Sequence, residues 1–298
     1  MHVLQKEGFE ISGFDCIFGG NLPVGAGLSS SAAVECGMIF SLNQIFELAQ
    51  SRKSLALMAQ QAEHLYPGVK CGIMDQYASL LGMDAHVLLL DCKTVEHEYL
   101  PFQLDDHSLF LINSKVQHSL AGGEYNVRRS QCAEGLRILG QKYPGATSFR
   151  TVTREMLESC KDALDPEIYR RCGYVVSEIE RTLAASEHLK KAEIGAFGAL
   201  MYATHRGLSK DYEVSCEELD FLVEEARKRG VTGSRMMGGG FGGCTINIIE
   251  QDHADAVISE IVQEYEKKFG IAPEVIPVKI SNGTHPIELQ QAEVAGSR

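Results

Sequence analysis

The chain has 298 residues, of which 44% are hydrophobic and 23% charged, as expected of a globular protein with two domains or one large one. Its formal net charge of -12 argues against nucleic acid or an anionic membrane as the main partner. No apolar run approaches the roughly eighteen residues of a membrane-spanning helix, and residues 1–7 lack the apolar core of a signal peptide. The nine cysteines are scattered and never spaced as Cys-x-x-Cys, so we expect reduced thiols and a cytoplasmic location.

The first predicted element is a strand pair or a bulged strand over residues 9–18, where apolar and polar residues alternate in two registers. Apolar residues then recur at helical spacing over 33–46. A second helix is predicted over about 54–65 and is ended by Pro67 and Gly68. Residues 71–82 read as an irregular segment and a turn.

The next segments predict strands. The continuous apolar run at 87–90 is typical of a buried strand, with 97–102 as its neighbour, and 109–112 is a further buried strand. Polar residues at 105–107 separate them. We therefore place the domain boundary there, giving an N-terminal domain over 1–105 and a C-terminal domain over 106–298.

The second half of the chain is mainly helical. Asp165 is predicted to cap a helix whose first residue is Pro166, and a capping box over 215–218 opens another helix that Gly230 closes. A glycine loop at 238–243 leads into a strand. This order of elements predicts an α+β fold. The helices are expected at about 123–141, 166–188, 192–205, 217–229 and 253–269, the strands at 244–249 and 274–280, and a frayed tail at 290–298.

The stretch over residues 21–33 reads Asn-Leu-Pro-Val-Gly-Ala-Gly-Leu-Ser-Ser-Ser-Ala-Ala, a glycine turn that runs into the predicted helix. We call it the serine loop. The free N–H groups of a helix N-terminus and of a glycine turn bind anions such as phosphate. An ordinary serine N-cap explains the same residues equally well.

Other motifs are excluded. No Gly-Lys pair occurs, so the P-loop motif Gly-x-x-x-x-Gly-Lys-Ser/Thr is absent. The match to Gly-x-Gly-x-x-Gly at Gly238, Gly240 and Gly243 precedes a strand, whereas a dinucleotide fingerprint opens a helix. Spacings typical of structural zinc are missing.

Four segments, taken in chain order, resemble the galactokinase family of the GHMP kinase superfamily. The serine loop is similar to its phosphate-binding motif, and Ala62-Glu63-His64 followed by Cys71-Gly72-Ile73-Met74-Asp75-Gln76 is similar to its catalytic segment. Residues 113–129 resemble the sugar-side stretch, and Met237–Thr245 resembles the third motif. The resemblance implies a two-domain α+β fold, with an N-terminal part like ribosomal protein S5 domain 2, truncated here, and a ferredoxin-like C-terminal part.

The resemblance also implies an activity: transfer of the γ-phosphate of ATP to the anomeric C1 hydroxyl of galactose, with Mg²⁺ as cofactor. Ser31 and Glu63 would hold Mg²⁺, an ion that prefers oxygen ligands. Asp75 would contact the anomeric hydroxyl and act as general base, or at least orient it. The partners would be galactose and ATP only, and the chain a monomer. The ATP phosphates would lie on Gly25, Ala26, Gly27, Leu28, Ser29, Ser30 and Ser31, and the sugar on Gly72, Asp75, Tyr125 and Gly240.

Each of these roles has a plainer alternative. Asp75 fits a turn or cap residue, Glu63 a solvated charge, and Ser31 a helix cap. Tyr125 fits a packed surface side chain with its hydroxyl in water. Arg128, like its neighbour, is assigned only to the surface.

The family also has an N-terminal motif, Gly-Arg-x-Asn-x-x-Gly-Glu-His-x-Asp-Tyr, which this sequence does not contain. By resemblance, that motif would place an arginine beside Asp75. We therefore expect the 298-residue chain to be at most weakly active and poorly soluble when expressed alone. Two alternatives stay open: a sensor that binds galactose and ATP without turnover, and a kinase for a related sugar such as N-acetylgalactosamine or arabinose.

Overall fold

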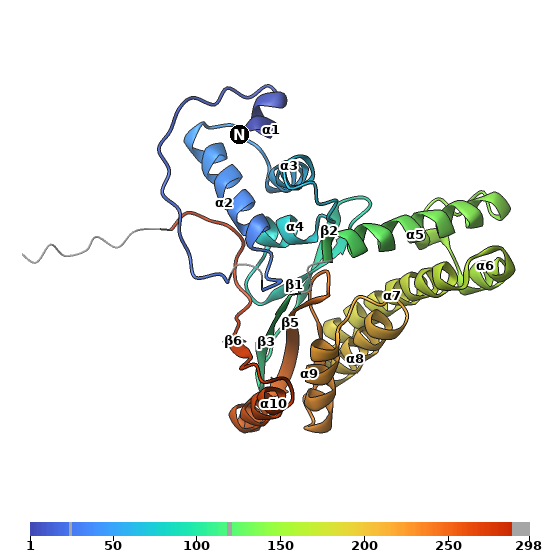
Figure 1. The fold of residues 1–298 in the computed structure, drawn as a ribbon. Helices are drawn as coiled ribbons and strands as arrows, with labels where there is room; N and C mark the ends of the chain where they lie inside the picture. The colour runs from blue at the N-terminus through green and yellow to red at the C-terminus, as the bar shows by residue number, and fades with distance from the viewer. Residues whose placement is uncertain (24–25, 118–120, 288–298) are drawn as a thin grey trace, which may run out of the picture.

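The computed structural model describes residues 1–23, 26–117 and 121–287. Its N-terminal part is a group of helices beside a two-stranded antiparallel sheet (Figure 1). Leu4, Cys36, Leu55 and Leu80 belong to the fully buried core between the helices. The elements are α1 (His2–Lys6), α2 (Ser30–Ile45), α3 (Arg52–Leu65), α4 (Met74–Leu81), β1 (His86–Asp91) and β2 (Glu96–Pro101).

The C-terminal part contains a four-stranded antiparallel sheet in the order β4-β5-β3-β6. Phe110 and Ile112 of the central strand β3 pack into the cluster under α9 and α10, whereas Leu111 between them packs with Ala26 and Cys244 on the opposite face. The serine loop therefore meets the sheet on the face that α9 and α10 leave open. The elements are β3 (His107–Gln117), β4 (Gly233–Met236), β5 (Gly242–Glu250), β6 (Glu274–Pro277), α8 (Ile194–Lys210), α9 (Glu217–Lys228) and α10 (Ala254–Phe269).

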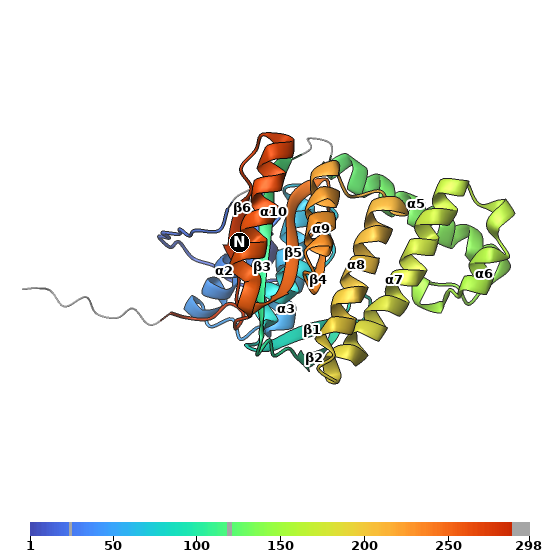
Figure 2. The same ribbon diagram turned by 90° about the horizontal axis from the view of Figure 1, so that it is seen from below.

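A helical arm extends to one side of the sheet, as both views show (Figures 1 and 2). It consists of α5 (Ala121–Lys142), α6 (Arg154–Glu158) and α7 (Pro166–Lys190) around a core of its own. The predicted start of α7 is confirmed, because Asp165 Oδ1 accepts hydrogen bonds from the backbone N–H groups of Glu167 (2.8 Å) and Ile168 (3.4 Å). In the described ranges, no helix combines the length and apolar character needed to cross a membrane.

The strand expected at 9–18 is wrong, since residues 9–23 form no regular secondary structure. The apolar side chains of this segment do not all lie on one buried face. Phe9, Ile11 and Phe14 pack against the core of the N-terminal helices, while Ile17 and Phe18 are exposed. A strand also needs a neighbour to satisfy its N–H and C=O groups, and local alternation does not supply one.

Other differences concern shorter elements. Residues expected to be irregular at 71–82 contain α4, and β1 is half-buried rather than buried. The capping box is also wrong, because Cys216 is the N-cap of α9 and forms no side-chain cap hydrogen bond. Gly230 does close α9, with φ of +75°. The tail expected at 290–298 lies outside the described residues.

We predict that two glycines of α8 respond oppositely to alanine. A Cβ at Gly198 would lie 2.1 Å from the Thr232 carbonyl oxygen, so Gly198→Ala should destabilise the fold by about 1–3 kcal/mol. A Cβ at Gly195 would meet no atom of another element within 4 Å. Gly195→Ala should therefore stabilise the fold by up to about 1 kcal/mol. Urea unfolding of both variants measures this, and equal losses would contradict the close α8–β4 packing.

Candidate active site

The serine loop ends at the N-terminus of α2 without a cap. Ser29 is the N-cap residue, but its φ of +52° is left-handed and its side chain makes no cap hydrogen bond. Ser30 and Ser31 occupy the first turn of the helix, and Ser31 is exposed. A serine is therefore at the N-cap position, but it lacks the hydrogen bond of a serine cap, and such an uncapped helix N-terminus suits an anion.

The serine loop packs backbone to backbone against the glycine loop. The Cys244 thiol donates to the Ala26 carbonyl oxygen at 3.2 Å. A Cβ at Gly27 would lie 3.6 Å from the Gly243 Cα, and one at Gly243 only 3.0 Å from the Ala26 oxygen. Both glycines have positive φ, +72° and +84°. Two loops more than 200 residues apart in the sequence thus touch only because side chains are missing there.

Asp75 lies beside these loops. It sits in the first turn of α4, half-buried, and lines a cavity of about 470 Å³ together with Gly27, Ser29 and Gly238. The cavity is walled by α2 and α4 on one side and by β3, β6 and the glycine loop on the other. Its remaining lining residues are Asn21, Leu22, Pro23, Leu28, Ala32, Ala33, Met74, Ala78, Ser79, Leu111, Met237, Ile276 and Val278.

Hydrogen bonds tie the segment that precedes Asp75 to α3. The Cys71 carbonyl oxygen lies 3.1 Å from Gln60 Nε2, which donates to it, and 2.9 Å from His64 Nε2. This explains why the two halves of the predicted catalytic segment lie together. Glu63, between those two residues, points into the helical core and is only 7% exposed.

Glu63 is buried, so the alternative that it is a solvated surface charge is wrong. Its Oε2 atom is buried without a hydrogen-bond partner. On its other side lies Glu35 of α2: burial raises the pKa of Glu35 to about 8, and a hydrogen bond between the two carboxyl groups acts in the same direction. The hydrogen bond between the two carboxyl groups requires a proton, and Glu63 Oε2 is still left as a buried acceptor without a donor.

Ser31 and Glu35 are four residues apart on α2, so both lie on one side of that helix. Oxygen donors from Ser31 and Glu63 suit Mg²⁺, which typically takes one or two carboxylates and completes its shell with water and substrate phosphates. Within the described ranges, no three His, Cys, Asp or Glu side chains are grouped to hold a metal ion. The two oxygen donors named above are thus the only part of a metal site for which the described residues give support, and the role of Mg²⁺ stays a prediction.

The other predicted residues are more dispersed. Gly72 is exposed and does not line the cavity, and neither does Gly240, whose Cβ position is only 2.0 Å from the Val214 carbonyl oxygen. Tyr125 belongs to α5, and its side chain is outside what the structure describes, as is Gly25 altogether. The structure thus brings Gly27, Leu28, Ser29 and Asp75 into one cavity. The other described residues of the prediction, Ala26, Ser30, Ser31 and Glu63, do not line it.

Sequence reasoning missed three polar residues, of which Gln76 and Arg128 are buried and Glu35 is partly buried. Glu35 is hydrogen-bonded to Glu63, and Gln76 donates to Glu35. The available signals were the position of Glu35 one turn after Ser31 and that of Gln76 directly after Asp75. Arg128, assigned to the surface, is only 7% exposed. It donates to the backbone oxygens of Tyr212 (2.9 Å) and Glu213 (2.8 Å), which hold the segment that supports the glycine loop.

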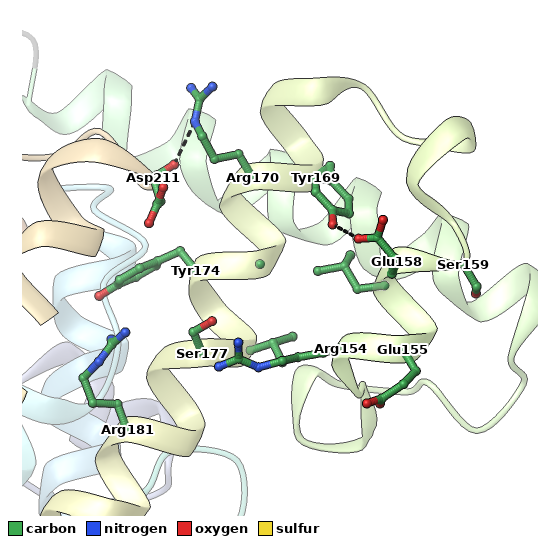
Figure 3. A pocket seen from close by; sticks show the side chains of 13 residues that line it. Arg154, Glu155, Glu158, Ser159, Tyr169, Arg170, Tyr174, Ser177, Arg181 and Asp211 are labelled. Carbon is green, nitrogen blue, oxygen red and sulfur yellow. Dashed lines mark hydrogen bonds between the residues drawn. The ribbon is translucent and has the colours of Figure 1, made fainter. Parts of the chain in front are cut away.

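A larger cavity, about 860 Å³, lies in the helical arm between α6 and α7 (Figure 3). Its arginines are engaged with acidic side chains: Arg154 pairs with Glu180 at 2.6 Å, and Arg170 with Glu213 at 2.7 Å. None of the predicted site residues lines it. Its size alone therefore does not make it the candidate site.

Comparisons with known proteins show the family. The family model described as GHMP kinases N terminal domain matches residues 1–83, and the GHMP kinases C terminal model matches 185–267. The galactokinase of Thermococcus kodakarensis is 41% identical over 94% of this chain and 77% of its own length. Human galactokinase is 43% identical over 86% of this chain and 64% of its own length.

Solved structures give the same result. The crystal structure of Lactococcus lactis galactokinase complexed with galactose superposes with a TM-score of 0.88 at 32% identity, covering 95% of this chain and 73% of that one. Homoserine kinase from Cytophaga hutchinsonii, at 16% identity, has a TM-score of 0.56 over 88% of this chain and 69% of its own, a likeness of fold alone.

We predict that Gly240→Ala disrupts the glycine loop. The new Cβ would collide with the Val214 carbonyl oxygen, and a φ of +86° strains any other residue. Gly230→Ala is the matched control, because its φ of +75° carries the same strain while nothing lies within 4 Å. Calorimetry with an ATP analogue should show at least about tenfold weaker binding for Gly240→Ala only, and unchanged binding would contradict the role of this contact.

Proposed function

The chain belongs to the galactokinase family of the GHMP kinases, and from this membership we propose that it transfers the γ-phosphate of ATP to the anomeric C1 hydroxyl of galactose. It has the two-domain α+β fold of that family. One feature supports the activity above all others: the anion-binding end of the serine loop and the Asp75 carboxylate line the same cavity. A phosphoryl-transfer site needs this pairing of phosphate cradle and acceptor-side carboxylate.

On the nucleotide side, the backbone from Gly25 to Ser31 binds the ATP phosphates. The uncapped first turn of α2 supports this, because its N–H groups and the helix dipole favour negative charge at that point. The glycine loop holds the serine loop from behind through Gly243 and Cys244. The binding groups are therefore in place before the nucleotide arrives, which lowers the cost of ordering them.

On the acceptor side, Asp75 accepts a hydrogen bond from the sugar's C1 hydroxyl. It then either takes the proton as general base or orients the hydroxyl for attack on the γ-phosphorus. Its half-buried place at the cavity wall keeps the carboxylate within reach of a ligand. Gly72, Tyr125 and Gly240 remain our predicted contacts for the rest of the sugar, and the similarity to Lactococcus lactis galactokinase, which was crystallised in complex with galactose, supports this sugar as the acceptor.

Ser31 and Glu63 would hold Mg²⁺. The buried, unpartnered Oε2 of Glu63 supports this role, because such an oxygen is costly unless a cation or a donor satisfies it. When bound, the ion would neutralise charge on the phosphates.

We predict that the chain releases ADP only when galactose is present. The chain is mixed with ATP and each sugar in turn, and ADP is measured. Galactose should give the highest kcat/KM. A preference for N-acetylgalactosamine or arabinose would assign the chain to a related sugar, and binding of both ligands without ADP release would make it a sensor.

We predict that Asp75→Ala lowers kcat by about 10²–10⁴-fold while ATP still binds. Asp162→Ala is the matched control, because Asp162 is an exposed carboxylate on the helical arm. Steady-state rates and calorimetry with an ATP analogue separate the two effects. An Asp75→Ala variant with unchanged kcat would remove this carboxylate from the mechanism.

We predict that Ser31→Ala and Glu63→Gln raise the Mg²⁺ concentration needed for half-maximal rate by about tenfold or more, because each removes an oxygen ligand. The measurement is a Mg²⁺ titration of the rate at saturating galactose and ATP. Glu266→Gln, an exposed change on α10, is the control. An unaltered titration in both site variants would place the ion elsewhere.

A further inference from the structure

The strand β4 leads directly into the glycine loop. Its last residue, Met236, pairs with Thr245 of β5 and is fully buried. β4 is the first strand in the order β4-β5-β3-β6, so one side of it has no strand neighbour in the described sheet. A backbone N–H group on that side needs another partner, because a buried donor without one is costly. Helix α8 packs against β4 and supplies an acceptor.

His205 of α8 is that acceptor. The Met236 backbone N–H donates to His205 Nδ1 at 3.1 Å, and the histidine is only 6% exposed. A ring nitrogen that accepts carries no proton, so the proton of the neutral imidazole is on Nε2. That atom lies 3.2 Å from Oδ1 of Asp220 on α9, although the two are not aligned as a hydrogen bond. The carboxylate therefore faces the nitrogen that has to keep its proton.

Asp220 is itself held in place. Its other oxygen, Oδ2, accepts hydrogen bonds from Ser209 Oγ at 2.6 Å and from Lys210 Nζ at 3.3 Å. The lysine can only donate, so it requires an oxygen at that position. Oδ1 is thereby directed to His205. A carboxylate fixed in this way selects one tautomer of the histidine beside it.

A displacement of Met236 would be transmitted to the cavity. The next residue, Met237, donates its backbone N–H to the Cys244 carbonyl oxygen at 3.0 Å and closes the glycine loop. Met237 and Gly238 both line the candidate cavity. A Cβ at Gly238 would lie 3.4 Å from the Gly27 carbonyl oxygen, so this end of the glycine loop also lies against the serine loop. Met236 is thus two residues from a contact between the two loops.

We propose that His205, in the tautomer selected by Asp220, is a positioning residue for the glycine loop and, through that loop, for the nucleotide phosphates. His205 does not line the cavity and acts by fixing the Met236 N–H at the base of the loop. The nucleotide part of this inference rests on the proposed function, whereas the fixing of the loop does not.

Two variants separate the roles of the ring nitrogens. The amide oxygen of His205→Asn can take the place of Nδ1. The amide of His205→Gln reaches the place of Nε2 and leaves the Met236 N–H without an acceptor. In the ligand-free chain, the Met236 amide should exchange its hydrogen about tenfold faster in His205→Gln than in His205→Asn, measured by nuclear magnetic resonance. Calorimetry should show about tenfold weaker binding of an ATP analogue to His205→Gln.

A merely structural role predicts the reverse order. Asparagine is the smaller of the two side chains and leaves the larger void in place of the buried ring, so packing alone makes His205→Asn the more damaging change. Equal amide exchange and equal analogue binding in the two variants, or larger effects in His205→Asn, would therefore overturn the proposal.

Asp220→Asn tests the tautomer by replacing a single atom, and it carries the test if a His205 variant does not fold. Ser209 and Lys210 keep the amide oxygen at the Oδ2 position, so the amide nitrogen would donate to Nε2 and the ring proton would move to Nδ1. We expect the same faster exchange and weaker binding as in His205→Gln. Unaltered values in folded Asp220→Asn would contradict the role of the pair.

The control is His253→Gln, an exposed change directly before α10, which should alter neither quantity. Amide exchange is measured without nucleotide or sugar, and analogue binding without turnover. A chain whose exchange rates differ as expected but that releases no ADP would thus refute the proposed galactokinase activity alone and support the positioning of the loop.

Discussion

The site depends on one contact between two glycine loops. Ala26 and Gly27 lie against Gly243 and Cys244 so closely that a side chain at Gly243 would come within 3.0 Å of the Ala26 carbonyl oxygen. This contact joins the N-terminal helices to the four-stranded sheet at the place where the cavity opens. Since backbone packing of this kind tolerates no added atoms, the relative position of the serine loop and the glycine loop is set within narrow limits.

The charges of the site follow from the same arrangement. Helix α2 directs its uncapped N-terminus at the cavity, where anions are favoured, and one turn later it presents Glu35 to Glu63, where burial raises the pKa of Glu35 to about 8. A nucleotide with a bound divalent cation carries both signs of charge. On the function that we propose, this one helix would supply both the phosphate-binding terminus and Ser31, one of the two predicted ligands of the ion.

Much of the fold, and the serine loop of the candidate site, were predictable from local patterns. The serine loop, the long helices and the cap at Asp165 depend on residues close together in the sequence, and their periodicity or turn chemistry is visible there. The strand expected at 9–18 was wrong because a strand needs a partner that local alternation does not specify. Arg128 and Glu35 were missed for the same kind of reason, since their partners lie on other elements, 84 residues away for Arg128 and Tyr212.

The sequence by itself determined the family, the order of the motifs and the types of residue available for chemistry, because glycine turns, serine clusters and acidic side chains carry these properties wherever they lie. Only the tertiary structure decided which of them meet. In the tertiary structure, Gly27, Ser29 and Asp75 line one cavity. Gly240 lies against Val214 instead, and Glu63 is buried against Glu35. The physical reason is that burial and contact depend on the packing of distant elements, which no local pattern encodes.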